Sequence, residues 1–459
     1  MRLATIACVL AATTGPALAQ VDHQMLAGDP PSPSQDDLAK AADATAEVAA
    51  VPGDPAELAQ AADATAEVAA VPPAGTPSKP SSDDIDLSAL GLDPASAAAF
   101  DDKLNLYGFA DFGFSGSHWG KDITFIPNNT RSFAIGNLNV YLAKNLTSKA
   151  RALAEIRFLF LPNGSQNLDG TQVDATANDP TNFGRPVQWG GIVIERAYVE
   201  YDVTEHLTVR GGHWLTPYGI WNTDHGSPVI IATFRPYIIG EQFFPEHQTG
   251  LDMFGSYATS GYKIGYHLTA SNGRGGSEAQ ADVDSKLAFG GRVEVETPFG
   301  AKLGASYYRG RYTSLTTTVG AMPETFLEAS YGGDVQFDRG PLHLQGEVIA
   351  REHHFASGQR AATAAGFMPD GRDIGFYGLV GYRFDRLWNV MPFFFHEDYR
   401  PSDHTITSRV RAENFGLNFR PSPAWVLKVG GGYVAFVGDQ GLFAGNTIWI
   451  YSTQASWVF

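Results

Sequence analysis

The sequence predicts an all-β protein, a 16-stranded antiparallel transmembrane β-barrel with an inward-folded third loop, preceded by a disordered periplasmic segment. Three observations favour this fold. Apolar and polar residues alternate over the last thirteen residues, and tight turns and long polar connections follow one another in strict order. No apolar run reaches the roughly 20 residues that a membrane helix needs. In lipid, a closed barrel is the remaining way to satisfy every backbone hydrogen bond.

The alternation is clearest from Thr447 to Phe459. One face carries Trp449, Tyr451, Thr453, Ala455, Trp457 and Phe459, and the other is largely hydroxyl and amide, with Ser452, Gln454 and Ser456. A period of two is that of a strand, whose successive side chains point to opposite faces. An aromatic-tipped face and a polar face are typical of a strand between lipid and water. We therefore take the parity of Phe459 as outward.

The connections between strands are of two kinds. Seven are short and rich in turn residues, at 146–149, 204–206, 259–261, 297–300, 338–341, 385–388 and 422–425. Eight are longer and polar, near 117–130, 162–190, 215–248, 273–285, 312–324, 354–372, 400–407 and 438–446. Bacterial barrels keep tight turns on the periplasmic side and longer loops outside. A soluble sandwich would show the same period of two but has no reason to sort its connections.

Three segments precede or form the barrel. Residues 1–19 read as a signal peptide, with Arg2 before an apolar stretch and Ala17-Leu18-Ala19 at the cleavage site, although a lipoprotein signal at Cys8 is an alternative. Residues 20–103 carry 16 acidic and 3 basic residues and a tandem repeat of period 20, which predicts a flexible acidic periplasmic tether. A folded domain or coiled coil is the alternative there. Residues 104–459 are predicted to form the barrel.

The parity of Phe459 assigns charged side chains to the inner face. Val193, Ala197, Val199 and Tyr201 face lipid in the fourth strand, and the predicted pore-lining residues are Asp111, Arg151, Glu155, Arg157, Arg196, Glu200, Arg210, Lys263 and Arg292. Two interpretations stay open. The arginines pair with carboxylates across strands, as in any water-filled barrel, or they form a cationic stripe that attracts small anions. Reversal potentials across a salt gradient decide between them.

The third long loop is unusually apolar. Between Val229 and Phe244 it carries Ile230, Ile231, Phe234, Tyr237, Ile238, Ile239 and Phe243. Exposed loops seldom carry so much apolar surface, so we expect this loop to fold inward and narrow the pore. Its charged residues Asp224, Arg235, Glu241 and Glu246 then face the channel. A loop that contacts a partner or another subunit is the alternative.

The sequence shows no catalytic or metal site. In His396-Glu397-Asp398, adjacent strand residues point to opposite faces and cannot converge on one ion. No serine stands in a nucleophile-elbow setting and no phosphate-binding Gly-Lys-Ser/Thr loop is present. We expect neither a cofactor nor an enzyme. The net charge of −17 makes nucleic acid an unsuitable partner.

The segment from Leu104 to Phe459 resembles a Gram-negative outer-membrane porin, and more particularly the phosphate-selective porin type. The resemblance rests on Leu106-Tyr107-Gly108-Phe109-Ala110-Asp111, on the run from Gly211 to Gly219, on Ser271-Asn272-Gly273, on Tyr331-Gly332-Gly333-Asp334 with Gly346-Glu347, and on the terminal Phe459. The third loop departs from the phosphate-selective pattern, because between Thr216 and Glu246 it holds Arg235 as its one strong base and no lysine cluster.

The resemblance implies a homotrimer in the outer membrane, where lipid and lipopolysaccharide surround each barrel. It implies passive diffusion of small hydrophilic solutes or ions, with anions such as phosphate as a narrower possibility. Phe459 would be the signal read by the barrel-insertion machinery. The alternative function is a structural or adhesive barrel that binds a partner through its long loops.

Overall fold

The structure is a computed structural model, and it describes residues 103–122, 129–160, 165–166, 172–173, 189–223, 226–240, 242–275, 284–319, 322–355, 362–363, 366–367, 370–384, 387, 389–402, 408–438 and 443–459. The predicted signal peptide and almost all of the predicted tether lie outside these residues. No helix in the described part of the chain is both long and apolar enough to cross a bilayer.

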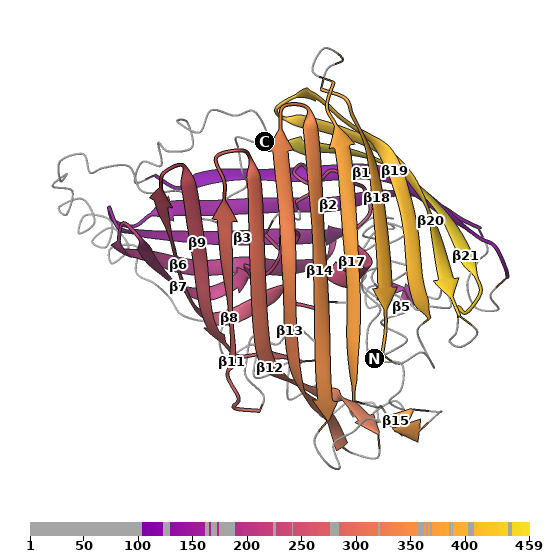
Figure 1. The fold of residues 1–459 in the computed structure, drawn as a ribbon, viewed down its shortest axis with the longest axis horizontal. Coiled ribbons are helices and arrows are strands. Elements are labelled where there is room, and N and C mark those ends of the chain that lie inside the picture. Colours follow the sequence, from indigo (N-terminus) through magenta and orange to yellow (C-terminus); the bar gives the residue numbers. More distant parts are fainter. Residues whose placement is uncertain are drawn as a thin grey trace, which may run out of the picture. The chain divides into compact units, whose positions relative to one another are not determined.

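The described residues form one large sheet that closes on itself (Figure 1). Its sixteen antiparallel strands are β1 (Asn105–Trp119), β2 (Asn129–Asn145), β3 (Ala150–Phe160), β6 (Trp189–Thr204), β7 (Leu207–Leu215), β8 (His247–Thr259), β9 (Tyr262–Ser271), β11 (Ala288–Glu296), β12 (Ala301–Val319), β13 (Met322–Arg339), β14 (Leu342–Phe355), β17 (Gly371–Tyr382), β18 (Met391–Arg400), β19 (Arg409–Ser422), β20 (Trp425–Val437) and β21 (Thr447–Val458). The predicted sixteen-stranded antiparallel barrel is therefore confirmed.

Closure joins the first strand to the last. β1 pairs with β21 over a run that begins at Phe109 opposite Val458 and ends at Trp119 opposite Ile448. The backbone of Phe459 continues this seam, because its N–H donates to the carbonyl of Gly108 and its carbonyl accepts from the Gly108 N–H, each at 2.9 Å. Pairing around the whole ring leaves the barrel without a free sheet edge.

The short connections fall where the sequence predicts them. They join β2 to β3, β6 to β7, β8 to β9, β11 to β12, β13 to β14, β17 to β18 and β19 to β20. The β8–β9 turn shows why these residues suit the position. Ser260 and Gly261 both have positive φ, 48° and 82°. A two-residue turn of this hand matches the twist of the strands it joins, and glycine adopts it without steric cost.

The faces of the strands follow the predicted parity at the closing seam. On β21, Trp449 and Tyr451 are exposed, whereas Ile448 and Ile450 are almost fully buried. The same alternation recurs on β20, where Trp425, Leu427 and Val429 are exposed and Val426 and Lys428 are buried. The barrel therefore has an apolar outer face and an inner face that packs against other parts of the chain.

Two sequence expectations need correction. The long connection expected at 312–324 is mostly hairpin, because β12 and β13 pair as far as Val319 opposite Met322. Its threonines are polar, yet they are good strand formers, so polarity alone misplaced the strand ends. The second correction concerns Val193, which was expected to face lipid. It lies opposite Arg157 and so shares the inner face, while Ile194 is exposed.

Shorter elements lie in the connections. β10 (Arg274–Gly275) pairs in parallel with β12, and two small hairpins are formed by β4 (Ser165–Gln166) with β5 (Gln172–Val173) and by β15 (Ala362–Thr363) with β16 (Gly366–Phe367). The single short helix of the described residues, α5 (Tyr237–Gly240), belongs to the connection between β7 and β8.

Candidate functional site

The inner face of β6 to β8 is built around one arginine. Arg210 on β7 contacts Glu200 of β6 through Nη2 at 2.7 Å and Asp252 of β8 through Nη1 at 3.4 Å. Its guanidinium carbon also lies 4.6 Å from the ring centroids of Tyr198 and Phe254. All three charged side chains are fully buried. Two carboxylates and two aromatic faces thus compensate the desolvation of this cation.

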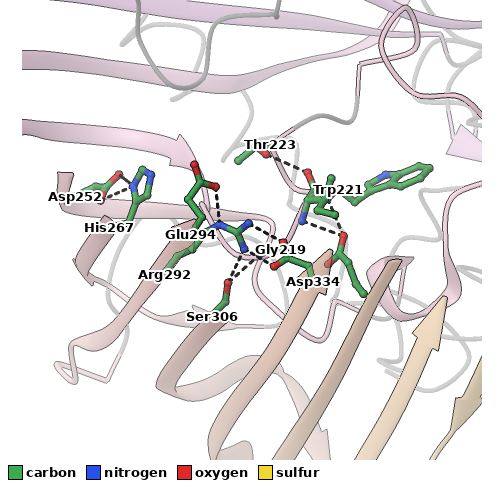
Figure 2. Close-up of polar contacts among 11 residues, drawn as sticks. Gly219, Trp221, Thr223, Asp252, His267, Arg292, Glu294, Ser306 and Asp334 are labelled. Carbon is green, nitrogen blue, oxygen red and sulfur yellow. Dashed lines mark hydrogen bonds and ion pairs between the residues drawn. The ribbon is translucent and has the colours of Figure 1, made fainter. Parts of the chain in front are cut away.

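This contact belongs to a longer row of alternating charges. Glu200 also binds Arg151 of β3 at 2.5 Å, and Arg151 reaches Asp202 at 2.9 Å. At the other end, Asp252 contacts His267 Nδ1 of β9 at 3.1 Å (Figure 2). The row crosses five neighbouring strands, and basic and acidic side chains alternate from one strand to the next.

A second pair lies between β3 and β6. Arg196 Nε binds Glu155 at 2.6 Å, and Glu155 also accepts a hydrogen bond from the Asn139 side chain at 2.6 Å. The guanidinium carbon of Arg196 lies 5.3 Å from the ring centroid of Tyr141. Both partners of the ion pair are buried, so removing either one would leave an uncompensated charge.

A β-bulge adds a carboxylate that the sequence did not reveal. The β3–β6 register shifts between Glu155 and Ile156, so that Glu195 and Arg196 are both buried. Glu195 binds Arg157 at 2.9 Å and His247 Nε2 of β8 at 2.7 Å. Alternation in the sequence offers no sign of such an extra residue, because a bulge reverses the parity on one side of it.

The fifth arginine of the predicted set is held on β11. Arg292 makes a two-point contact with Asp334 of β13, at 2.6 and 2.9 Å, and reaches the Ser306 hydroxyl at 3.1 Å. Glu294 Oε2 lies 3.4 Å from Arg292 Nε (Figure 2). A fork of this geometry fixes the guanidinium plane as well as its position.

Each of the five predicted inner arginines therefore has a carboxylate partner, and none of them contributes an uncompensated positive charge. Among the remaining predicted residues, Asp111 is buried and accepts from the backbone and side chain of Asn137 at 3.2 and 2.9 Å. Lys263 is exposed near the turn end of β9.

The connection between β7 and β8, residues 216–246, packs against the buried face of the opposite strands. The backbone N–H groups of Ile220 and Trp221 each donate to Glu347 Oε1 of β14 at 3.0 Å. Tyr377 of β17 donates its hydroxyl to the same oxygen at 2.7 Å. One carboxylate thus holds the start of the connection.

The middle of residues 216–246 is anchored by hydrogen bonds to the backbone carbonyl groups of every second residue. The donors are three side chains of β19 and β20, with Lys428 Nζ to Ser227 O at 2.6 Å, Arg420 Nη2 to Val229 O at 3.2 Å, and Asn418 Nδ2 to Ile231 O at 3.0 Å. Ser227 and Val229 lie in a turn, in which the N–H groups of Val229 and Ile230 donate to the Gly226 carbonyl at 2.9 and 3.1 Å.

The end of the connection is held by α5 and aromatic contacts. The Tyr237 N–H donates to Glu397 Oε2 of β18 at 2.5 Å, and the Tyr237 ring stacks on Tyr399 at 4.9 Å. Phe243 packs edge-on against the same Tyr399 ring at 5.6 Å. Around these rings the connection and the strands form one buried apolar cluster, whose members from the connection are Tyr218, Trp221, Ala232, Phe234, Tyr237, Ile238, Ile239, Phe243 and Phe244.

Of the four charged residues predicted in this connection, the structure describes two. Arg235 and Glu246 pair with each other at 2.7 Å. Asp224 and Glu241 lie outside the described residues. Among the described residues, no group of three metal-ligating side chains is present.

These features define a class: a closed antiparallel barrel with an apolar outer face, a charged inner face and a long connection anchored to the buried side of the wall. Its solved structural neighbours are outer-membrane porins and channels. They include the anion-selective porin from Comamonas acidovorans, at 11% identity and TM-score 0.48, covering 78% of this chain and 99% of that one. OprB of Pseudomonas putida matches at 9% identity and TM-score 0.49, covering 77% and 94%. The outer membrane channel DcaP of Acinetobacter baumannii matches at 11% and 0.47, covering 78% and 97%.

Comparisons of the sequence with known proteins find one relative and no family. No family model matches the chain. One relative, an uncharacterised protein of Aquifex aeolicus, is 26% identical over 272 residues, which cover 52% of this chain and 61% of that protein. The chain therefore spans about three fifths of the length of the relative it matches.

Proposed function

We propose that the protein is an outer-membrane channel through which small hydrophilic solutes diffuse passively. The observation that carries the proposal is the division of the closed barrel into an apolar outer face and an inner face with a row of charges. An apolar exterior suits lipid, and a charged interior suits a water-filled path. The predicted tether, residues 20–103, would then lie in the periplasm and the barrels would assemble as homotrimers.

The proposal includes a constriction formed by residues 216–246. Support comes from the hydrogen bonds of this connection to Glu347, Glu397 and Lys428, whose side chains lie on the buried face of the wall. A connection held on that face narrows the space that remains for solutes. The paired Arg235 and Glu246 would border the path.

Ion selectivity is the finer part of the proposal. Because each inner arginine of the predicted set has a carboxylate partner, we expect weak ion preference rather than strong selection of phosphate or other anions. Reversal potentials across a salt gradient measure this directly. A strong anion preference would restore the cationic-stripe interpretation.

Purified full-length protein in a planar lipid bilayer tests the function. A channel gives stepwise ohmic conductance that grows in proportion to salt concentration. A barrel that inserts and stays silent would contradict the proposal and favour the structural or adhesive alternative. Insertion is checked separately, by co-flotation of the protein with lipid vesicles.

A further inference from the structure

The outer face of β18 and β19 carries an unusual ladder of side chains. Three cross-strand pairs follow one another from the turn end toward the loop end, namely Phe394 with Phe415, His396 with Glu413, and Asp398 with Arg411. Arg400 ends β18 and Arg409 begins β19. The outer face thus changes from aromatic to charged within a few residues.

The parity of these residues is fixed by their neighbours. On β18, Glu397 and Tyr399 contact Tyr237 of the β7–β8 connection, so Asp398 and Arg400 point the other way. On β19, Val410 and Ala412 belong to the buried apolar cluster, so Arg409 and Arg411 also point outward. The exposed rings of Phe394 and Phe415 lie on the same side.

Three arginines share one carboxylate in this cluster. Asp398 accepts from Arg400 Nε at 3.0 Å, from Arg409 Nε at 3.0 Å and from Arg411 Nε at 3.2 Å. Arg409 adds a second contact through Nη2. One negative charge thus faces three positive ones, and the cluster keeps a local excess of two positive charges.

The excess charge points away from the barrel. The side chains of Arg400 and Arg411 are 54% and 49% exposed, whereas Asp398 is 6% exposed. Each of these two arginines binds Asp398 through Nε, and their terminal Nη groups make no recorded hydrogen bond to another described residue. On the neighbouring strand β17, Arg372 is also 55% exposed and has Glu352 at 3.8 Å.

The height of the cluster fits the edge of a membrane. Arg400 lies nine residues beyond Met391, where β18 begins. At about 3.3 Å per residue and a strand tilt of about 40°, that is on the order of 23 Å, close to the roughly 25 Å height of an apolar band. A charged side chain facing the hydrocarbon is costly, and long arginine side chains avoid the cost by reaching polar headgroups.

We propose that Arg400, Arg409 and Arg411 form a binding site for the phosphate groups of an outer-leaflet lipid headgroup. The terminal Nη groups of Arg400 and Arg411, which point away from Asp398, match phosphate oxygens in two-point geometry. The exposed Phe394 and Phe415, which the His396–Glu413 pair separates from the cluster, offer an apolar surface for the acyl chains of the same molecule. The inference rests on the outer-membrane location in the proposed function, and it does not require the barrel to conduct.

Binding of diphosphoryl lipid A to the full-length protein in detergent, followed by native mass spectrometry, tests this site. The double variant Arg400→Gln/Arg411→Gln keeps the two-point Arg409–Asp398 contact, so that Asp398 retains a partner. We expect its affinity for diphosphoryl lipid A to fall at least tenfold. The control Lys149→Gln/Arg339→Gln removes the same charge from the turn end of the barrel and should bind like the unaltered protein.

The unaltered protein supplies a measurement that does not depend on the variant folding. It should bind diphosphoryl lipid A at least tenfold more tightly than dephosphorylated lipid A, and inorganic phosphate alone should not compete at equal concentration. Equal affinity for both lipids, or full competition by phosphate, would overturn the inference. So would a double variant that binds lipid A normally but changes oligomeric state, since the cluster would then contact a second copy of the chain.

Conductance of the same preparations in phosphatidylcholine bilayers separates this inference from the proposed function. If the barrel does not conduct but still binds phosphorylated lipid more tightly, the lipid site is supported and the proposed channel function is contradicted. If the barrel conducts but binds both lipids equally, the channel function is supported and the lipid site is contradicted.

Discussion

Lys428 Nζ lies 2.6 Å from the carbonyl oxygen of Ser227, a residue 201 positions earlier in the chain. The Lys428 amino group is fully buried, and among the described residues it also donates to the side-chain oxygen of Gln454 at 3.1 Å. A buried polar group is costly unless it is hydrogen-bonded, so the two acceptors of the Lys428 amino group must be well placed. The contact ties the middle of residues 216–246 to β20.

Replacing Lys428 by Met should loosen this tie. The Ser227 carbonyl loses its donor, which costs about 1–3 kcal/mol where water cannot replace it. We expect single-channel currents to fluctuate more between levels, because the connection is less firmly held. Lys149→Met, on an exposed lysine of the β2–β3 turn, is the matched control. Currents as steady as those of the unaltered protein would contradict a positioning role for Lys428.

Removing residues 226–242 should raise the single-channel conductance. The deletion takes out the three anchored carbonyls and α5 while it keeps the contact of Ile220 and Trp221 with Glu347. Deleting residues 172–188, the same number of residues from the connection between β3 and β6, controls for the loss of loop length alone. Unchanged conductance in the 226–242 deletion would argue against a constriction by this connection.

Glu294→Gln should shift the reversal potential toward anions. Glu294 is partly exposed, and Arg292 keeps its two contacts with Asp334 when the Glu294 charge is removed. One unit of negative charge beside the path influences ions within about 10 Å at 0.1 M salt. Glu205→Gln, on a highly exposed carboxylate in the β6–β7 turn, should have no effect. A reversal potential that does not move in Glu294→Gln would place this residue away from the path.

Phe459→Ala should lower the amount of barrel assembled in the outer membrane without destabilising barrels that have already formed. The ring is more than half exposed, so its loss removes little buried area, while the backbone of residue 459 keeps its contacts with Gly108. Phe299→Ala, on an equally exposed ring in the β11–β12 turn, is the control. Assembly should be followed by the heat-dependent shift in electrophoretic mobility. If both variants assemble normally, Phe459 carries no signal for the insertion machinery.

The sequence predicted the strands well because the signals that define them are local. The turn residues at Ser260 and Gly261 and the alternation from Thr447 onward each depend on neighbours in the chain. The bulge at Glu195 was not predicted, because an inserted residue leaves the alternation of side chains intact on each side of it. Beyond the bulge, however, the residues that face inward and those that face outward are exchanged. The continuation of the β12–β13 pairing beyond Thr313 was missed because polarity was read as a loop signal.

The anchoring of residues 216–246 was beyond local reasoning for a different reason. Its apolar content predicted a packed segment, yet the partners Glu347, Glu397 and Lys428 lie between 127 and 201 residues away in the chain. Four of the five predicted inner arginines meet carboxylates on a neighbouring strand, and Arg292 of β11 reaches Asp334 across β12. Which carboxylate each one meets depends on the register of the strands, as Arg157 and Glu195 show.

The seam between β1 and β21 also bears on proteolysis. Every barrel strand is hydrogen-bonded on both sides, so cutting one connection frees no strand. A protease that nicks an exposed connection would leave two fragments that still migrate together until the sample is boiled. Release of a fragment would require two hydrogen-bonded ladders to open at once, the one beside the cut connection and the one between β1 and β21. Resistance of the barrel to digestion therefore depends on the ring as a whole and not on the continuity of the chain.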